Sequence, residues 1–230
     1  MKGKIEYLTY QDACSFLLPR HYSGRKPVIS LAFGWFIDGG LKAVCSFGKP
    51  ASPFLCKGIM NGEFVSNVYE LNRLCRVESL NEQLSQFVGA CLRRISINNW
   101  IVVSYADSGM NHNGYIYQAC NFIYTGATKK RTDKYTEGNK HSRHYDNTNQ
   151  NGKRKIRTSK HRYVFFATKD KKLKKEWLSK LAYPIENYPK NENKNYILGE
   201  YLEPEVINGQ GKSRASESDN ERNFTTNTKG

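Results

Sequence analysis

The sequence has 230 residues, a length that suits one sizeable hydrophobic core with an appended segment. Its content of 38% hydrophobic and 13% aromatic residues excludes a wholly disordered chain. The formal net charge of +15 indicates a polyanionic partner, and no apolar run approaches the roughly 20 residues of a membrane span. Six scattered cysteines without a Cys-x-x-Cys pair favour reduced thiols over disulfides or a zinc site.

The first predicted elements are a strand, a helix and a hairpin. Residues 5–8 have strand character, and residues 9–18 have the apolar spacing of a helix. Residues 28–37 and 41–47 flank an Asp-Gly-Gly turn, the pattern of a β-hairpin. These elements open what we predict to be an α/β fold.

A polar loop, PRHYSGRKP at residues 19–27, joins the helix to the hairpin and holds Arg20, His21, Tyr22 and Arg25. Neighbouring basic and aromatic side chains suit contacts to phosphates and bases, so we predict a substrate loop, with a solvated surface loop as the alternative. His21 is a candidate general base. A role for it as a metal ligand is the lesser alternative, and we predict no metal site.

The next stretch combines a loop with an unusually charged strand. Residues 48–67 contain two prolines and are expected to form a loop or lid, and VYELNRLCR at residues 68–76 a strand. Buried charges in a strand need partners. Glu70 and Arg73 form an internal ion pair, or else Glu70 and Asn72 face the cleft and act on the acceptor amine. Alternation places the following on one face: Tyr69, Leu71, Arg73 and Cys75.

A helix is predicted within residues 76–95, with Ser79 as its N-cap and Glu82 at capping-box spacing. Gly89 falls inside this helix, where it is interpreted as permitting close packing. The predicted inward side chains are Leu80, Leu84, Phe87, Val88, Cys91, Leu92 and Ile95.

The segment WIVVSYADSGMNHNGYIYQACNFIYTG, residues 100–126, is where we expect the functional site. A buried strand comes first, and polar residues from Ser104 to Asp107 close it. Asn111 is predicted to cap a short helix before strand character returns at residues 122–124. Open α/β sheets bind ligands at the carboxyl ends of their strands. Ser104 and Asp107 are therefore candidates to accept a proton or orient an amine, with turn and cap chemistry as the equal alternative.

Residues 129–180 carry 18 Lys or Arg against 5 Asp or Glu, which is half of the 36 basic residues in the chain. Clustered cations with interleaved aromatic residues favour phosphate contacts over a purely solvating surface. We expect a mobile loop, then a strand at residues 161–167 and a basic amphipathic helix ended by Pro184. The predicted nucleic-acid contacts are Arg20, Lys129, Lys130, Arg131, Lys134, Arg143, Lys153, Arg154, Lys155 and Arg157.

The chain is accordingly divided into a core at residues 1–127, a basic extension at 128–202 that completes the domain, and a disordered tail at 203–230.

Two patterns resemble known families. The GNAT acyltransferases carry a helix of the form Asn-x-x-Ala-x-x-Leu-Tyr-x-x-x-Gly-Phe, matched here by Asn111, Gly114, Ile116, Tyr117, Asn121 and Phe122. The run from Pro19 to about Tyr135, including PRHYSGRKP, VYELNRLCR and SYADSGMNHNGYIYQACNFIYTG, is similar to the Mom family of Mu-like bacteriophages. These are GNAT-like enzymes that modify adenine in phage DNA. The resemblance implies a GNAT-like mixed central sheet flanked by helices.

The resemblance also implies a reaction. The family converts adenine to N6-carbamoylmethyladenine, which protects phage DNA from host restriction. Tyr117 matches the GNAT tyrosine that protonates the leaving group, next to a splayed strand pair whose backbone polarises the acyl carbonyl. The target base must leave the duplex, and Tyr22, Tyr105 and Tyr124 are candidates to stack on it. The other predicted substrate contacts are Arg25, Asn72, Arg73, Asn111 and Asn121.

The acyl donor is the least constrained part of this prediction. A standard GNAT binds the pyrophosphate of coenzyme A with a glycine-containing loop, and no glycine pair follows residue 76 here. Because the added group has the atoms of a glycine residue, we favour glycyl-tRNA, with acetyl-CoA and an iron centre as the alternative.

The expected partners are double-stranded DNA and tRNA, and we expect no membrane association. The expected location is the cytoplasm of the infected bacterium. A homodimer is a further possibility that the sequence leaves open. The competing interpretations are a non-catalytic basic DNA-binding protein and an ordinary acetyltransferase.

Overall fold

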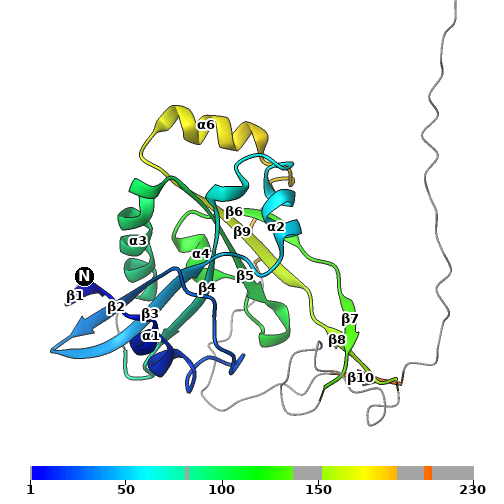
Figure 1. Ribbon diagram of the computed structural model, residues 1–230, viewed down its shortest axis with the longest axis horizontal. Helices are drawn as coiled ribbons and strands as arrows, with labels where there is room; N and C mark the ends of the chain where they lie inside the picture. Colours follow the sequence, from blue (N-terminus) through cyan, green and yellow to red (C-terminus); the bar gives the residue numbers. More distant parts are fainter. Residues whose placement is uncertain (1, 81–82, 137–151, 191–204, 209–230) are drawn as a thin grey trace, which may run out of the picture. The chain divides into compact units, whose positions relative to one another are not determined.

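A computed structural model describes residues 2–80, 83–136, 152–190 and 205–208 (Figure 1). The chain forms two compact units. The first comprises Met1–Arg131 with Arg157–Pro204, and the second Thr132–Ile156 with Glu205–Gly230. In the part of the chain that the structure describes, no helix has the length and apolar character needed to cross a membrane.

The first unit contains a seven-stranded sheet with the order β1-β2-β3-β4-β5-β9-β6. Neighbouring strands run antiparallel except β4 and β5, which are parallel. The mixed central sheet that we predicted is therefore confirmed. Its strands are β1 (Lys4–Tyr7), β2 (Leu31–Ile37), β3 (Gly40–Gly48), β4 (Val68–Arg76), β5 (Trp100–Asp107), β9 (Lys160–Ala167) and β6 (Ile123–Ala127).

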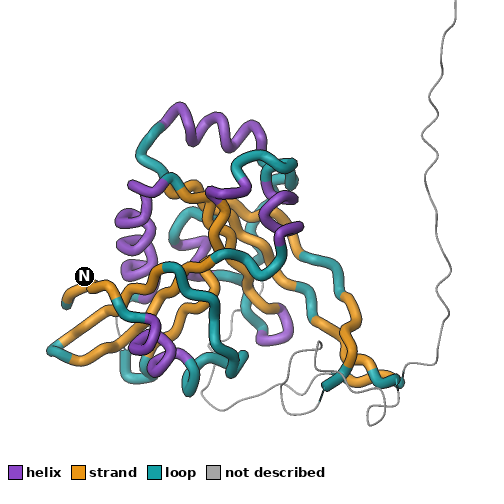
Figure 2. The backbone as a smooth tube through the Cα atoms, in the orientation of Figure 1, coloured by secondary structure: helices purple, strands orange, loops and turns teal. Residues whose placement is uncertain are grey.

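Helices cover both faces of this sheet (Figure 2). Along a strand, successive side chains point to opposite faces. Val102 of β5 packs in one core cluster with α3 and α4, whereas Ile101 and Val103 pack in another with α2 and α6. Ala32 of β2 packs against α1. The helices are α1 (Tyr10–Leu17), α2 (Pro53–Ile59), α3 (Leu84–Ile95), α4 (Tyr115–Ala119) and α6 (Lys171–Lys180), with short 3-10 turns η1 (Val65–Asn67), η2 (Ser96–Asn98) and η3 (Ser108–Met110).

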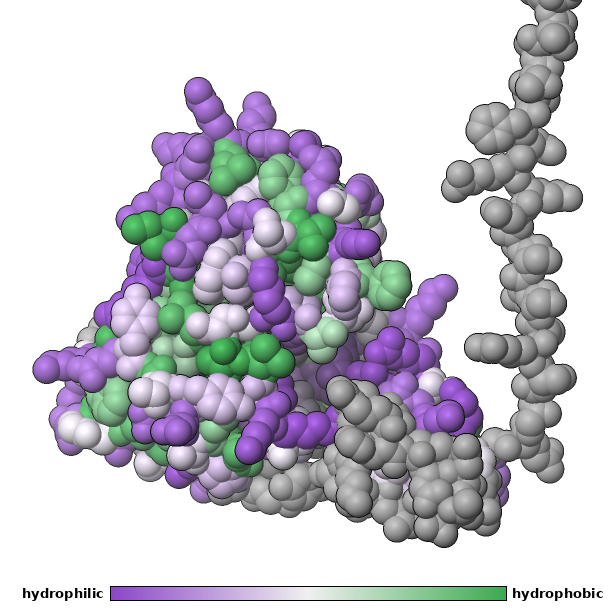
Figure 3. Space-filling model, viewed as in Figure 1, coloured by the Kyte–Doolittle hydropathy of each residue, from purple (hydrophilic) through white to green (hydrophobic). Residues whose placement is uncertain are grey.

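Helix α6 is the predicted basic amphipathic helix. Asp170 caps it, because Oδ1 accepts from the backbone N–H groups of Lys172 at 2.8 Å and Leu173 at 3.1 Å. Trp177 is fully buried, while most of the helix's lysines are exposed and contribute to the hydrophilic surface over α6 in Figure 3. The helix ends at Lys180, so Pro184 lies beyond it.

Two predictions around α2 and α3 are wrong. Residues 48–67, expected to be a loop, contain α2, because Cys56 and Ile59 are buried and anchor one of its faces. Helix α3 begins at Leu84 instead of near Ser79. Leu80 is buried in the core and its carbonyl accepts from Arg76 Nη1 at 2.7 Å, which keeps the preceding segment outside the helix.

Two further local interpretations are also wrong. A Cβ atom at Gly89 would meet only Arg93 Nη1 at 3.5 Å, an ordinary contact, so this glycine permits no close packing. Asn111 does not cap α4: it ends η3 in a left-handed conformation, with φ of 53°. Instead, Asn113 Oδ1 accepts from the Tyr115 backbone N–H at 3.2 Å, next to the start of α4.

The predicted strand at residues 161–167 is present as β9, but it lies inside the large sheet between β5 and β6. Tyr163 and Val164 of this strand are fully buried. The sequence-based division at residue 127 differs from the two compact units, because the first unit runs to Arg131 and resumes at Arg157. The basic extension therefore contributes a core strand.

The second unit is built on a small sheet of order β10-β8-β7, formed by β7 (Arg131–Lys134), β8 (Arg154–Arg157) and β10 (Val206–Ile207). Arg154 of β8 stabilises the pairing with β7. Its Nε donates to Thr132 Oγ1 at 3.0 Å, and its Nη2 donates to the Thr132 carbonyl at 3.1 Å. Strand β10 falls in the segment predicted to be disordered. The rest of that tail, and most of the predicted mobile loop, lie outside the described residues.

Candidate active site

The candidate site begins where β4 and β5 separate. These parallel strands pair only from Val68 to Glu70 with Ile101 to Val103, and each then follows its other neighbour. Ser104 Oγ donates to the Leu71 carbonyl at 3.0 Å, at the point of separation. Side chains from both strands, the loop at residues 19–27 and α4 surround a cavity of about 410 Å³ there. This volume lies within the range of roughly 300–1,000 Å³ that is typical of small-molecule sites.

A β-bulge in β4 decides which side chains reach this cavity. Ser46 of β3 pairs with Arg73 and Phe47 pairs with Leu71, so Asn72 is the extra residue. The predicted strict alternation is therefore wrong: Leu71 packs on the α3 side, whereas Cys75 packs on the α1 side.

Asn72 itself has a structural role in this geometry. Its Oδ1 accepts from Ser46 Oγ at 2.7 Å, and its Nδ2 donates to the Val28 carbonyl at 2.6 Å. Both ends of the amide are therefore engaged within the protein, although the residue lines the cavity. This arrangement holds the bulge and does not suit the predicted action on an acceptor amine.

The loop at residues 19–27 supplies one wall. Arg20, His21, Tyr22 and Arg25, all predicted from the sequence, line the cavity together with Ser23. The His21 and Tyr22 rings are stacked, with centroids 4.4 Å apart. The wall thus combines cations with aromatic faces, as the sequence indicated.

His21 is a hydrogen-bond donor in this setting. Its Nδ1 accepts from the Ser23 backbone N–H at 3.1 Å, so the neutral ring carries its proton on Nε2. Burial, followed by the charges of Arg73 and Lys160, lowers the pKa of His21 to about 3. With its Nδ1 lone pair occupied and its basicity low, His21 suits neither a general base nor a metal ligand.

Glu70 and Arg73 face the same part of the cavity because of the bulge. Burial raises the pKa of Glu70, and the charges of Arg73 and Lys160 oppose that shift only in part. Burial lowers the pKa of Arg73, whereas Tyr22 and Glu70 favour its charged form. Glu70 therefore has the raised proton affinity expected of a general base.

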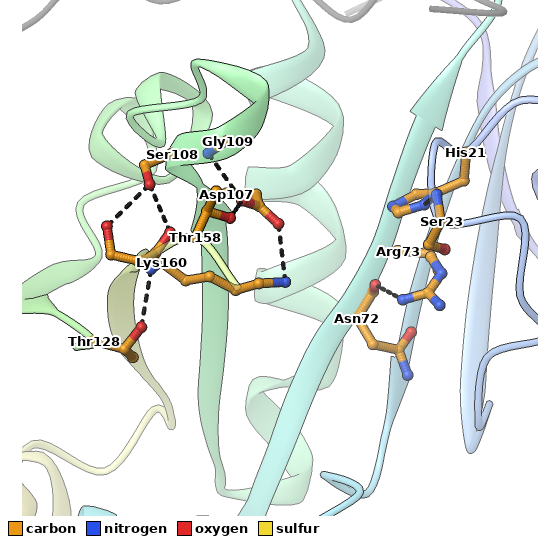
Figure 4. A network of polar contacts seen from close by, with 11 residues as sticks. His21, Ser23, Asn72, Arg73, Asp107, Ser108, Gly109, Thr128, Thr158 and Lys160 are labelled. Atoms are coloured by element: carbon orange, nitrogen blue, oxygen red, sulfur yellow. Dashed lines mark hydrogen bonds and ion pairs between the residues drawn. The ribbon is translucent and has the colours of Figure 1, made fainter. Parts of the chain in front are cut away.

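Lys160 lines the opposite side of the cavity, and its partner Asp107 lies next to it without lining the cavity (Figure 4). Asp107 Oδ1 accepts from the Gly109 backbone N–H at 3.0 Å and from Thr158 Oγ1 at 2.6 Å. Its Oδ2 pairs with Lys160 Nζ at 3.1 Å, and Lys160 lines the cavity. Asp107 thus orients a cation in addition to capping the turn. Nothing in the sequence singled out Lys160, which lies 53 positions after Asp107 and reaches it only through β9 pairing.

The α3 and α4 side of the cavity is mainly apolar, and Tyr117 provides its hydroxyl group. Burial raises the pKa of the Tyr117 phenol, against a hydrogen bond with Ser104 that lowers it. Ser104 in turn donates to the Leu71 carbonyl. Tyr117 therefore holds its proton at neutral pH beside the point where β4 and β5 separate. The apolar lining residues on this side are Leu71, Leu74, Leu84, Ala106 and Ile116.

Sequence reasoning missed further lining residues besides Lys160, among them Ser23, His112, Cys75 and Arg76. Ser23 lies within the predicted loop, and the His112 ring contacts Tyr22 edge-on at 6.0 Å. Cys75 also lines the cavity, but burial raises the pKa of its thiol to about 12, so it is no nucleophile at neutral pH. Their neighbours in sequence give no signal of a shared cavity.

Other predicted site residues lie elsewhere. Asn111 and Asn121 are exposed, outside the cavity lining, with φ of 53° and 59°, a left-handed conformation that asparagine tolerates. Tyr124 is buried, and its hydroxyl contacts His161 Nδ1 at 2.8 Å. Tyr105 does line the cavity.

Of the predicted nucleic-acid contacts, Arg20 lines the cavity and Arg143 lies outside the described residues. The others lie in or next to the strands of the small sheet: Lys129, Lys130, Arg131, Lys134, Lys153, Arg154, Lys155 and Arg157.

The side chains of the site do not fit an iron centre, and the segment before α3 does not fit the pyrophosphate of coenzyme A. Within the ranges that the structure describes, no three His, Cys, Asp or Glu side chains come together as a metal site, and those of His21 and Asp107 are engaged as above. An iron centre therefore has no matching ligand set there. Between Arg76 and Leu84 the sequence has no glycine, and Leu80 is buried in the core, unlike a pyrophosphate-binding loop.

The sequence matches the model of the Mom protein family over residues 3–190, a span that includes every cavity-lining residue. Among curated proteins, none matches the sequence. An N-acetyltransferase from Staphylococcus aureus Mu50 has a similar structure, with 11% identity and a TM-score of 0.46, over 73% of this chain and 100% of that one. A Bacillus subtilis acetyltransferase in complex with CoA has 15% identity and a TM-score of 0.41, over 72% of this chain and 99% of that one.

Proposed function

The chain belongs to the Mom protein family, and we propose that it converts adenine in double-stranded DNA to N6-carbamoylmethyladenine, which protects phage DNA from host restriction. The observation that carries this proposal is the cavity at the β4–β5 separation. It joins a cationic, aromatic half to an apolar half with a protonated tyrosine. Transfer of an acyl group to a nucleobase uses both kinds of surface. The protein acts in the cytoplasm of the infected bacterium.

The polar half receives the base. Extruding adenine from the duplex costs on the order of a few kcal/mol, which stacking in the site must offset. The stacked His21–Tyr22 pair and Tyr105 offer aromatic faces, and each base stacked on an aromatic side chain gains ~1–3 kcal/mol. Glu70 accepts the N6 proton as N6 attacks, a role supported by its raised pKa.

Glycyl-tRNA is the proposed donor, because it supplies every atom of the added group. N6 attacks the glycyl carbonyl carbon, and the ester bond to the 3′ oxygen of the tRNA breaks. The free glycyl amine then attacks C6, the original C6–N6 bond breaks, and the former N6 leaves as the amide nitrogen. The proton that the amine loses goes to that nitrogen. The second step is an isomerisation, so neither an oxidant nor a second nitrogen source is required.

Acetyl-CoA is the alternative donor, and it is chemically more demanding. It brings two carbons but no nitrogen, and its methyl group would have to be oxidised. The absence of a glycine between Arg76 and Leu84, and the lack of an iron ligand set in the described part of the site, both favour glycyl-tRNA.

Tyr117 protonates the leaving 3′ oxygen. Burial raises the pKa of its phenol, which supports a group that keeps its proton until the ester bond breaks. Ser104 bonds to Tyr117 and to the Leu71 carbonyl and so positions it. Asp107 positions Lys160 across the cavity from Arg73 (Figure 4).

The direct test is to incubate the purified protein with adenine-containing DNA and either glycyl-tRNA or acetyl-CoA. The masses of the nucleosides are then measured by mass spectrometry. We expect modified adenine with glycyl-tRNA only, and none with uncharged tRNA. Product from acetyl-CoA alone would refute the tRNA donor, and no product from either would refute the enzyme.

Isotope labelling tests the rearrangement itself. With [15N]glycine on the tRNA, the label should stay on the exocyclic nitrogen bonded to C6 after acid hydrolysis of the side-chain amide. The released ammonia should be unlabelled, because it comes from the original N6. Labelled ammonia would show that the C6–N6 bond never broke.

The basic residues of the small sheet, including Arg131 and Arg154, are proposed to contact DNA or tRNA phosphates. This basic sheet also favours a second candidate, a non-catalytic DNA-binding protein. A variant that keeps DNA affinity but loses the modified base separates the two.

A further inference from the structure

Three buried side-chain nitrogen or oxygen atoms lack a hydrogen-bond partner in the described part of the chain. They are Ser23 Oγ, Arg73 Nε and Trp177 Nε1. The first two belong to residues that line the same cavity, whereas Trp177 is buried beneath α6. A buried donor without an acceptor costs roughly 1–3 kcal/mol, and more when it is charged. Two such donors in one cavity therefore indicate a place for an acceptor that comes from outside the chain.

Arg73 is held firmly in this position. Its Nη1 donates to the Asn72 carbonyl at 2.7 Å and its Nη2 donates to the Arg25 carbonyl at 3.4 Å. The two bonds fix the plane of the guanidinium and leave Nε as a buried nitrogen without a partner. The β4 bulge turns this side chain to the cavity, so the geometry is built into the sheet.

His21 adds a third donor next to these two. Because Nδ1 accepts from the Ser23 backbone N–H, the proton of the neutral ring lies on Nε2. Figure 4 shows His21, Ser23 and Arg73 together on the β4 side of the cavity. Arg20, Arg25 and Arg76 also line it, and the acidic side chain among the lining residues is Glu70. The local excess of cations favours an anion with several acceptor oxygens, such as a phosphodiester.

We propose that Ser23 Oγ and Arg73 Nε form a phosphate subsite for the DNA strand, which binds a phosphate next to the extruded adenine. This inference rests on the proposed function for the identity of the base. DNA is favoured over the tRNA end because the same loop carries the His21–Tyr22 stack, and a stacked base brings its own phosphates with it. Tyr117, which meets the donor, lies on the opposite, apolar side.

The first experiment changes the ligand and leaves the protein intact. Binding of a fluorescent single-stranded oligonucleotide, with one adenine in a thymine tract, is measured by anisotropy. A neutral methylphosphonate replaces one phosphate, either next to the adenine or several nucleotides away. We expect roughly tenfold weaker binding for one of the two adjacent positions and little change for the distant position. Equal effects at near and distant positions would overturn the subsite.

The second experiment couples this change to the protein. In Arg73→Gln, affinity for the natural oligonucleotide should fall roughly tenfold, and the adjacent methylphosphonate should cause no further loss. Arg73→Lys should lose most of the affinity as well, because lysine keeps the charge but cannot supply a fixed Nε donor. Ser23→Ala should weaken binding by roughly threefold. If Arg73→Lys binds like wild type, the hydrogen-bond assignment is wrong.

Arg93→Gln is the matched control, because Arg93 is exposed on α3 and does not line the cavity. It removes the same charge but should keep the full methylphosphonate effect. Uncharged tRNA is measured in parallel, and a loss confined to tRNA in Arg73→Gln would overturn the assignment to DNA. Thermal unfolding checks each variant; if Arg73→Gln unfolds, Ser23→Ala and the methylphosphonate series decide.

These binding measurements need no turnover. If the methylphosphonate effect depends on Arg73 but no modified nucleoside forms, the proposed function is refuted and the phosphate subsite stands. If modified nucleoside forms but the methylphosphonate effect does not depend on Arg73, only the subsite is refuted.

Discussion

The two halves of the cavity differ in chemistry although the same two strands build both. On the α1 side, arginines, His21, Tyr22 and Glu70 face the cavity, whereas on the α3 and α4 side leucines, Ile116 and Tyr117 line it. Neighbouring residues of a strand point to opposite faces of the sheet. Because β4 and β5 separate after Glu70 and Val103, one cavity reaches both faces.

In the proposed function, the two halves hold two unlike reactants. A charged nucleotide suits the side with cations and aromatic rings, and an acyl group suits the apolar side with a protonated phenol. Lys160 adds a cation to the lining from β9, and Asp107 pairs with it.

Tyr117→Phe tests the apolar half. Loss of the phenolic proton donor should reduce modified adenine by roughly 10²–10⁴-fold while DNA affinity stays unchanged. Quantitative nucleoside mass spectrometry and anisotropy measure the two properties. Tyr7→Phe is the control, since Tyr7 is exposed on β1 and does not line the cavity. Full activity in Tyr117→Phe would show that another acid protonates the leaving group.

Glu70→Gln tests the polar half through its pH dependence. The wild-type rate should rise with pH through the raised pKa of Glu70, because the ionised form is the base. The rate of the variant should be roughly 100-fold lower and should no longer rise with pH in this range. A variant with the same acid limb as wild type would assign that limb to another group.

Glu70→Gln should lower the rate, as above, but increase the stability of the protein at neutral pH. A carboxyl group whose pKa is raised in the folded state favours folding below its unfolded pKa, ~4.3, and this contribution is lost as pH rises through the folded value. Glu70→Gln should therefore raise the melting temperature at neutral pH but not at acidic pH, which corresponds to a gain in the free energy of unfolding on the order of 1 kcal/mol. Thermal unfolding at both pH values checks this, and destabilisation at neutral pH would contradict it.

Lys160→Gln tests whether Lys160 of β9 belongs to the polar half of the cavity. Asp107 would keep its bonds to Gly109 and Thr158 but lose its cation. We expect a loss of roughly tenfold in kcat/KM, with Lys160→Arg retaining more activity because it keeps the charge. An effect equal to that of an exposed lysine such as Lys172→Gln would remove Lys160 from the site.

Gly89→Ala has the smallest expected effect. The new methyl group would meet only Arg93 Nη1 at 3.5 Å in the middle of α3, so helix propensity should dominate. Stability should increase by ~0.5–1 kcal/mol with activity unchanged. Denaturant unfolding measures the gain. A fall in activity would mean that the donor needs the glycine backbone of α3, and that the apolar half binds a phosphate after all.

Local patterns in the sequence were sufficient for much of the architecture. The apolar spacing before Pro19 predicted α1, the Asp-Gly-Gly turn predicted the β2–β3 hairpin, and the strand ending at Asp107 is present as β5. These elements depend on interactions between residues close in sequence, which single-chain patterns report directly. The cluster of Arg20, His21, Tyr22 and Arg25 lines the cavity together, because one short loop carries all four.

The arrangement of the site depended on contacts between distant residues. The bulge at Asn72 turned Arg73 to the other face of β4, and no local pattern marks a bulge that is set by pairing with β3. Insertion of β9 between β5 and β6 brought Lys160 to Asp107, 53 positions earlier in the chain. Sequence periodicity indicates which elements form, whereas strand pairing and burial across the whole chain determine which side chains share a cavity.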